Sequence, residues 1–108
     1  MKIPTRFKLL GQTIEVKFCF DSRFVEKDSS IGFASYRLNS IFIKPNSEAH
    51  PLTTEQIEEA FFHELMHFVT YYAGAAYSGK HEYMHQDEGF IDMCAGLLHQ
   101  AFSTMEYD

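Results

Sequence analysis

The sequence predicts an α+β fold in which a small antiparallel sheet of about four strands precedes two helices. Three observations predict this class. Short apolar or alternating runs, typical of strands, occupy the first half of the 108-residue chain. The second half has two long stretches with apolar residues at helical spacing. The length and the 45% hydrophobic content suit a single domain, residues 1–108, with one modest core.

The first two strands are expected at residues 7–10 and 13–20. The second run alternates strictly between apolar and polar side chains, which indicates a strand with one buried face. Gly11 and Gln12, which separate the runs, suit a hairpin turn. The polar residues 21–30 that follow predict a loop or a short helical turn.

A second strand pair is expected at residues 31–36 and 40–44, with residues 37–39 as the connection. Pro45 ends the pair because proline cannot donate a hydrogen bond to a sheet ladder. A polar linker at 45–51 then leads into the helical half.

The first helix is expected to begin after Thr53 and to end at Gly74. Thr53 and Gln56 have the spacing of a capping box, and Leu52 can pack on Ile57 as a hydrophobic staple. Helical periodicity gives this helix an apolar face and a second face that carries histidines. The apolar face comprises Ile57, Phe61, Leu65, Phe68 and Tyr72, and the second face comprises Ala60, His63, His67 and Tyr71.

The second helix is expected from about Gln86 to Met105, after a loop at 75–85 that is rich in Tyr and His. Ala95 and Gly96 are small and allow this helix to approach the first one closely. Its apolar positions are Phe90, Met93, Leu97, Leu98 and Phe102.

The most informative motif is H-E-x-x-H, formed by His63, Glu64 and His67. Residues four apart lie on one face of a helix, so both imidazoles can reach a single metal ion. Glu64 lies beside that face and can act as a general base without being a ligand. In zinc hydrolases this arrangement lowers the pKa of bound water to about 7. We therefore expect one Zn²⁺ per chain, although two His and a carboxylate also suit Fe²⁺.

A catalytic zinc site needs a third protein ligand, for which Glu88 at the start of the second helix is the first choice. His85 is the rival ligand, and Glu88 can alternatively be an acid that the helix dipole favours. Asp92 follows one turn later and can accept the other ring N–H of a ligating His. His99 continues the same stripe of the helix, as a further site residue or as an ordinary histidine.

Four further side chains are candidates for stabilising the oxyanion of a tetrahedral intermediate, and pocket wall or core is the alternative for each one. They are Tyr71, Tyr77, His81 and Tyr83.

The motif His63-Glu64-x-x-His67, followed by Glu88-x-x-x-Asp92, resembles that of the gluzincin zinc peptidases. Between about Thr53 and Phe102 the chain is similar to the short phage and mobile-element metallopeptidases of the ImmA/IrrE type. The resemblance implies a minimal zincin fold with His63, His67 and Glu88 as zinc ligands. It further implies Glu64 as general base and Asp92 as the partner of a ligand. A SprT-like metallopeptidase would use a His after the loop, which would favour His85.

Composition narrows the classes of partner. A formal charge of −6 without a basic patch argues against nucleic acid. The start of the chain lacks the apolar core of a signal peptide, and no run of 18 apolar residues exists, so we expect a cytoplasmic protein without membrane contact. In that compartment Cys19 and Cys94 are expected to be buried free thiols, with a disulfide as the alternative.

The sequence thus predicts a zinc-dependent metallopeptidase that cleaves a protein or peptide. The resemblance implies that the substrate is one particular protein, such as a regulator, and a partner protein or domain is a further expectation. The substrate would lie along a sheet edge, at 31–36 or 40–44. The first alternative is a zinc-binding interaction or regulatory domain whose metal site is closed by His85 or Asp87. The second is a helical interaction domain without metal.

Overall fold

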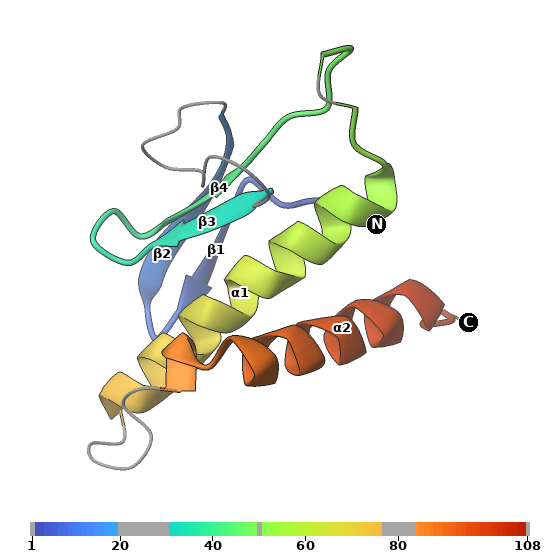
Figure 1. Ribbon diagram of the computed structural model, residues 1–108. Coiled ribbons are helices and arrows are strands. Elements are labelled where there is room, and N and C mark those ends of the chain that lie inside the picture. Colours follow the sequence, from blue (N-terminus) through green and yellow to red (C-terminus); the bar gives the residue numbers. More distant parts are fainter. Residues whose placement is uncertain (1, 20–30, 50, 77–83, 108) are drawn as a thin grey trace.

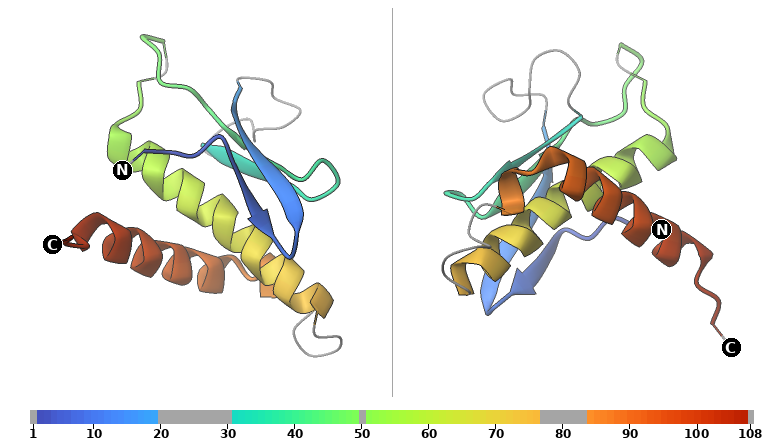
Figure 2. Two further views of the ribbon diagram at one scale, coloured as in Figure 1. Left: turned by 180° about the vertical axis from the view of Figure 1, so that it is seen from behind. Right: turned by 60° about the horizontal axis from the view of Figure 1, so that its bottom comes forward.

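The computed structural model describes residues 2–19, 31–49, 51–76 and 84–107, and it confirms an α+β fold (Figure 1). Helix α1 lies between the sheet and helix α2, so the molecule has three layers (Figures 1 and 2). The elements are β1 (Arg6–Leu9), β2 (Gln12–Phe18), β3 (Gly32–Ser35), β4 (Ser40–Ile43), α1 (Thr54–Ala76), the one-turn 3₁₀ helix η1 (Met84–Gln86) and α2 (Glu88–Thr104).

The sheet has the strand order β1-β2-β4-β3. The two predicted hairpins exist, since β1 pairs with β2 and β3 pairs with β4, both antiparallel. The prediction of an all-antiparallel sheet was wrong, because β2 and β4 pair in parallel, with Val16 beside Ile41. All four residues of β4 are buried, as expected for a strand with neighbours on both sides. The edges of the sheet are therefore β1 and β3.

The β1–β2 turn is one residue earlier than predicted. Leu10 and Gly11 both have positive φ, at 49° and 77°, which is typical of the two-residue turns that connect antiparallel strands. Gly11 tolerates this conformation because it has no Cβ. The predicted loop at 21–30 and residues 77–83 of the loop at 75–85 lie outside the described residues.

The predicted capping box begins α1. The Thr53 amide donates to Gln56 Oε1 at 2.8 Å, and the Gln56 amide donates to Thr53 Oγ1 at 3.1 Å. The helix continues two residues beyond the predicted end at Gly74. Its buried aromatic and aliphatic side chains form the core together with the inner face of the sheet and α2; the core includes Ile14, Ile41, Ile43, Phe61, Phe62, Phe68 and Ile91.

Helix α2 begins at Glu88, two residues after the predicted start, because Asp87 caps it by accepting a hydrogen bond from the Phe90 amide at 3.1 Å. Its buried residues are Ile91 and Ala95. Three of the apolar positions expected in this helix are exposed, since α2 packs mainly on α1. The exposed fractions are 59% for Met93, 60% for Leu97 and 47% for Phe102.

Cys19 and Cys94 form no disulfide, as predicted, but each is half-buried and not fully buried as expected. No helix among the described residues is both long and apolar enough to cross a membrane.

Candidate metal centre

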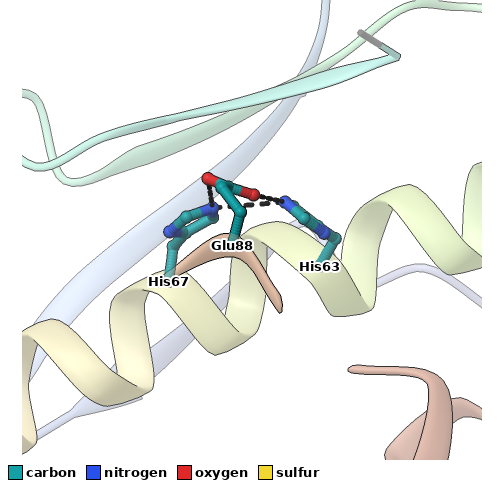
Figure 3. A group of neighbouring side chains, drawn as sticks. All are labelled: His63, His67 and Glu88. Carbon is teal, nitrogen blue, oxygen red and sulfur yellow. Dashed lines mark hydrogen bonds and ion pairs between the residues drawn. The ribbon is translucent and has the colours of Figure 1, made fainter. Parts of the chain in front are cut away.

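Two histidines of α1 face the start of α2. His63 and His67 lie one helical turn apart, as their spacing predicts, and their Nε2 atoms are 3.2 Å from each other. Figure 3 shows both rings directed toward the same point above the helix. The side chains are 24% and 11% exposed, so the packing of α1 holds both rings.

Glu88 completes a three-residue group. Its carboxylate spans the two rings, with Oε2 3.0 Å from His63 Nε2 and Oε1 3.1 Å from His67 Nε2 (Figure 3). The candidate ligand atoms all lie within 4.8 Å of one another, close enough to hold one metal ion. Two imidazoles and a carboxylate are donors that zinc accepts, and Fe²⁺ accepts the same set.

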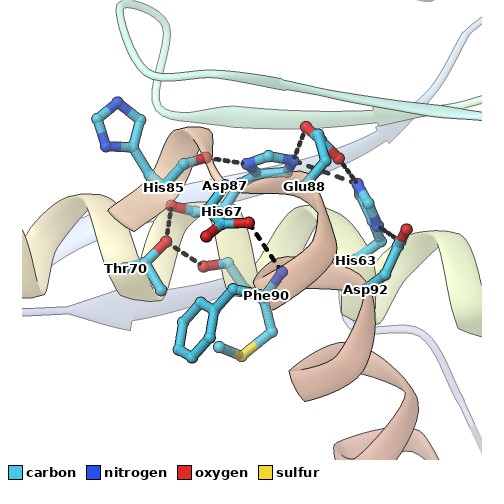
Figure 4. A network of polar contacts seen from close by, with 9 residues as sticks. His63, His67, Thr70, His85, Asp87, Glu88, Phe90 and Asp92 are labelled. Atoms are coloured by element: carbon cyan, nitrogen blue, oxygen red, sulfur yellow. Dashed lines mark hydrogen bonds and ion pairs between the residues drawn. The ribbon is translucent and has the colours of Figure 1, made fainter. Parts of the chain in front are cut away.

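The Nδ1 atoms of His63 and His67 are hydrogen-bonded elsewhere, which leaves both Nε2 atoms directed at Glu88. His63 Nδ1 lies 2.7 Å from Asp92 Oδ1, and His67 Nδ1 lies 2.6 Å from the carbonyl oxygen of His85 (Figure 4). Metal-binding histidines usually donate this second N–H to a carboxylate or a carbonyl, which fixes the ring orientation and the tautomer. Asp92 therefore lies where the sequence predicted a partner for a ligand.

His85 contributes its backbone, and its ring lies outside the group. The ring contacts Tyr36 and Tyr71 edge-on, with centroid distances of 5.2 and 5.1 Å. In Figure 4 the ring points away from the three donors. Its Nδ1 is buried and finds no hydrogen-bond partner in the part of the chain that the structure describes. The structure thus brings Glu88, and not the rival His85, to the two histidines.

Glu64 lies beside the group in a buried position, with 7% of its surface exposed. Burial, together with the nearby carboxylates of Glu88 and Asp92, raises the pKa of its carboxyl to about 8. Burial also lowers the pKa of His67, which favours the neutral imidazole that a metal requires.

Gly32 on β3 makes room for Glu64. A Cβ at this position would lie 3.0 Å from Glu64 Cγ and 3.1 Å from Glu64 Oε2, so the Glu64 side chain would have to shift by a few tenths of an ångström. The edge strand can approach the carboxylate closely because residue 32 is glycine.

A cavity of about 310 Å³ lies between β3 and the metal group. Its walls contain all three candidate ligands and the Glu64 carboxylate, together with residues of the edge strand. They are Gly32, Phe33, Ala34, Tyr36, His63, Glu64, His67 and Glu88. The arrangement therefore places three side chains that could hold a metal ion, and a buried carboxylate, at an open space next to a strand edge.

The remaining predicted site residues that the structure describes lie outside the group of three candidate ligands. Tyr71 stacks on Tyr36, with centroids 4.3 Å apart, and is absent from the cavity wall. His99 Nε2 lies 2.9 Å from Glu58 Oε1, at the contact between α2 and α1. The predicted oxyanion candidates Tyr77, His81 and Tyr83 lie outside the described residues.

Tyr36 is a site residue that the sequence did not reveal. It stands at the end of a short apolar strand, where an aromatic residue ordinarily indicates core packing. The sequence signal is its place as the last residue of the predicted strand 31–36, one of the two strands expected to bind a substrate. The sequence did not show that this strand lies beside the histidines.

Comparisons of this chain with protein-family profiles, with curated proteins and with solved structures find no match.

Proposed function

We propose that the protein is a small zinc-dependent metallopeptidase of the gluzincin type, similar in layout to ImmA/IrrE-type enzymes. The observation that carries this proposal is the combination of three convergent metal donors with a buried carboxylate at an open cavity. His63, His67 and Glu88 would hold the ion. Bound zinc would supply a Lewis acid that activates water and polarises a carbonyl group.

Glu64 is the proposed general base. It is adjacent to His63 in the chain and lines the same cavity as the ligands, but it is not one of the three grouped donors. Its carboxylate accepts a proton from the attacking water and passes that proton to the amine that leaves. A buried position keeps the carboxylate directed into the cavity and away from bulk water.

Strand β3 is the proposed substrate-binding edge. It pairs with β4 on one side only, and its residues Gly32, Phe33 and Ala34 line the cavity. An extended peptide can add to such an edge through backbone hydrogen bonds. Of the two edges predicted from the sequence, 31–36 keeps this role, because β4 lies between β2 and β3 and has no free edge.

The open form of the site is favoured over the closed form of a structural zinc domain. A closed site needs a fourth protein ligand, for which the sequence offers His85 and Asp87. The His85 ring is turned away against two tyrosines, and Asp87 Oδ1 accepts the Phe90 amide as a helix cap. A position for water or substrate therefore stays available at the three donors.

Metal content per chain tests the ligand set. The native protein and the variants Glu88→Ala, His85→Ala and Glu64→Gln are purified without added metal and analysed by mass spectrometry for metals. We expect close to one zinc per chain in the native protein, His85→Ala and Glu64→Gln, and a loss in Glu88→Ala. Loss in His85→Ala as well would indicate a closed site, and no metal in any form after zinc is supplied would contradict the proposal.

Cleavage is tested on a proteome-derived peptide mixture, with new termini identified by mass spectrometry. Zinc-loaded native protein is expected to generate termini that are absent with zinc-loaded Glu64→Gln. This variant keeps the ligands and lacks only the proton acceptor. If neither form cleaves, the same comparison on intact protein substrates decides between a selective peptidase and a non-catalytic zinc domain.

A further inference from the structure

Tyr36 is held rigidly at the end of the edge strand. Its ring stacks on Tyr71 of α1, with centroids 4.3 Å apart and planes inclined by 8°. Phe68 and His85 contact it edge-on at centroid distances of 5.3 and 5.2 Å. Aromatic contacts on several sides fix the plane of the ring, and thereby restrict where the hydroxyl group can lie.

The Tyr36 side chain borders the cavity that contains the metal group. It shares the cavity wall with the three candidate ligands and with Glu64. Tyr71, which stacks on it, does not contribute to that wall. Of the two stacked tyrosines, Tyr36 is therefore the one next to the space that a substrate would occupy.

The Tyr36 hydroxyl makes no hydrogen bond to any residue in the described ranges. The hydroxyl of Tyr72, by contrast, donates to Asn39 Oδ1 at 2.7 Å. A half-buried hydroxyl at a cavity wall that has no partner among the described residues has its donor available for a ligand. Burial raises the pKa of Tyr36 above its ordinary value, and the charges of Glu64 and Glu88 act in the same direction, so the hydroxyl keeps its proton.

We propose that Tyr36 is a catalytic residue that donates a hydrogen bond to the oxyanion formed from the scissile carbonyl group. This inference rests on the proposed peptidase function. When water adds to the carbonyl carbon, the electron pair of the C=O π bond moves to oxygen, and the Tyr36 O–H stabilises that charge without losing its proton. Donors of this kind change the rate of the chemical step by roughly 10²- to 10³-fold.

Glu64 and Tyr36 line the same cavity and come from different elements, since Glu64 belongs to α1 and Tyr36 follows β3. A carbonyl group bound in that cavity would have a proton acceptor for water at Glu64 and a hydrogen-bond donor at Tyr36. The sequence offered Tyr71 and three residues after α1 as candidates for this role, and Tyr36 was not among them.

The test uses acetohydroxamate as a probe, since its carbonyl oxygen mimics the reacting oxygen when the group binds a metal ion. The native protein, Tyr36→Phe and the matched control Tyr72→Phe are loaded with Co²⁺, and probe binding is followed by the visible spectrum of the cobalt. We expect unchanged Co²⁺ affinity in all three forms. Probe affinity should fall about tenfold in Tyr36→Phe, the effect of one lost hydrogen bond, and stay unchanged in Tyr72→Phe.

The outcomes separate this inference from the proposed function. Equal probe affinity in the native protein and Tyr36→Phe would overturn the role of Tyr36 and leave the peptidase proposal intact. Failure of the cobalt-loaded native protein to bind the probe would contradict the open site on which both rest. With a cleavable substrate, Tyr36→Phe should lower kcat about 100-fold with little change in KM.

Discussion

The two helices that carry the candidate metal ligands differ in how tightly they are packed. Helix α1 lies between the sheet and α2, and Phe61, Phe62 and Phe68 on it are at most 4% exposed. Helix α2 packs mainly on α1, and its Met93 and Leu97 are about 60% exposed. Packing therefore fixes α1 from two sides and α2 from one.

The candidate ligands follow the same division. The side chains of His63 and His67 on α1 are 24% and 11% exposed, whereas those of Glu88 and Asp92 on α2 are 63% and 70% exposed. The histidines are thus positioned by the core. The carboxylates are positioned by their contacts with the histidines and by the cap at the start of α2. We infer that α1 defines where a metal ion binds and that α2 completes its coordination.

The largest effect expected from this comparison is on stability. Phe68→Ala removes a fully buried ring of α1 and should lower the free energy of unfolding by about 3–5 kcal/mol. Leu97→Ala removes an exposed side chain of α2 and should change it by at most about 0.5 kcal/mol. Urea unfolding followed by circular dichroism measures both values. Equal losses in the two variants would show that α2 has a covered outer face in solution.

The second largest expected effect is on zinc affinity, and it concerns Asp92, which contacts His63. Asp92→Ala removes the acceptor 2.7 Å from His63 Nδ1 and should weaken zinc binding about 10- to 100-fold, because the ring loses its fixed orientation. Competition with a chromophoric chelator measures the affinity. Glu106→Ala, which removes an exposed acid beyond the end of α2, is the control for the change in net charge. An unchanged affinity in Asp92→Ala would show that packing alone orients His63.

The features that the sequence predicted correctly depend on local geometry. The capping box at Thr53 and the common face of His63 and His67 follow from helical spacing alone. The position of Glu88 beside these histidines required in addition that the second helix fold back on the first. That inference succeeded because Glu88 and Asp92, one turn apart, lie at the start of this helix.

The features that the sequence did not predict depend on contacts between distant segments. The parallel pairing of β2 with β4 is set by the path of the chain between them, which hydrophobic alternation does not encode. On α2 the apolar pattern did not show which residues are covered: Ile91 and the small Ala95 are buried, while Leu97 is exposed. Tyr36 became recognisable as a site residue only once β3 was seen to be the edge strand beside α1.

The smallest expected effect is a change in the free energy of unfolding when the contact between Glu58 and His99 is altered. Glu58 of α1 and His99 of α2 form an ion pair at 2.9 Å, with side chains that are 10% and 13% exposed. The hydrogen bond from His99 holds the pKa of the Glu58 carboxyl below its ordinary value of 4.5. A carboxyl group whose pKa is lower in the folded state stabilises the fold above its unfolded pKa, and this contribution is lost as the pH falls through the folded pKa.

Glu58→Gln should therefore lower the free energy of unfolding by about 1 kcal/mol between pH 5.5 and 7. Below pH 4.5 the difference from the native protein should shrink, because the native carboxyl becomes protonated as well. Urea unfolding at pH 7, 5.5 and 3.5 measures this profile, with Glu59→Gln as the control for an exposed neighbouring acid. A difference that stays constant down to pH 3.5 would show that Glu58 joins the helices through packing and not through its charge.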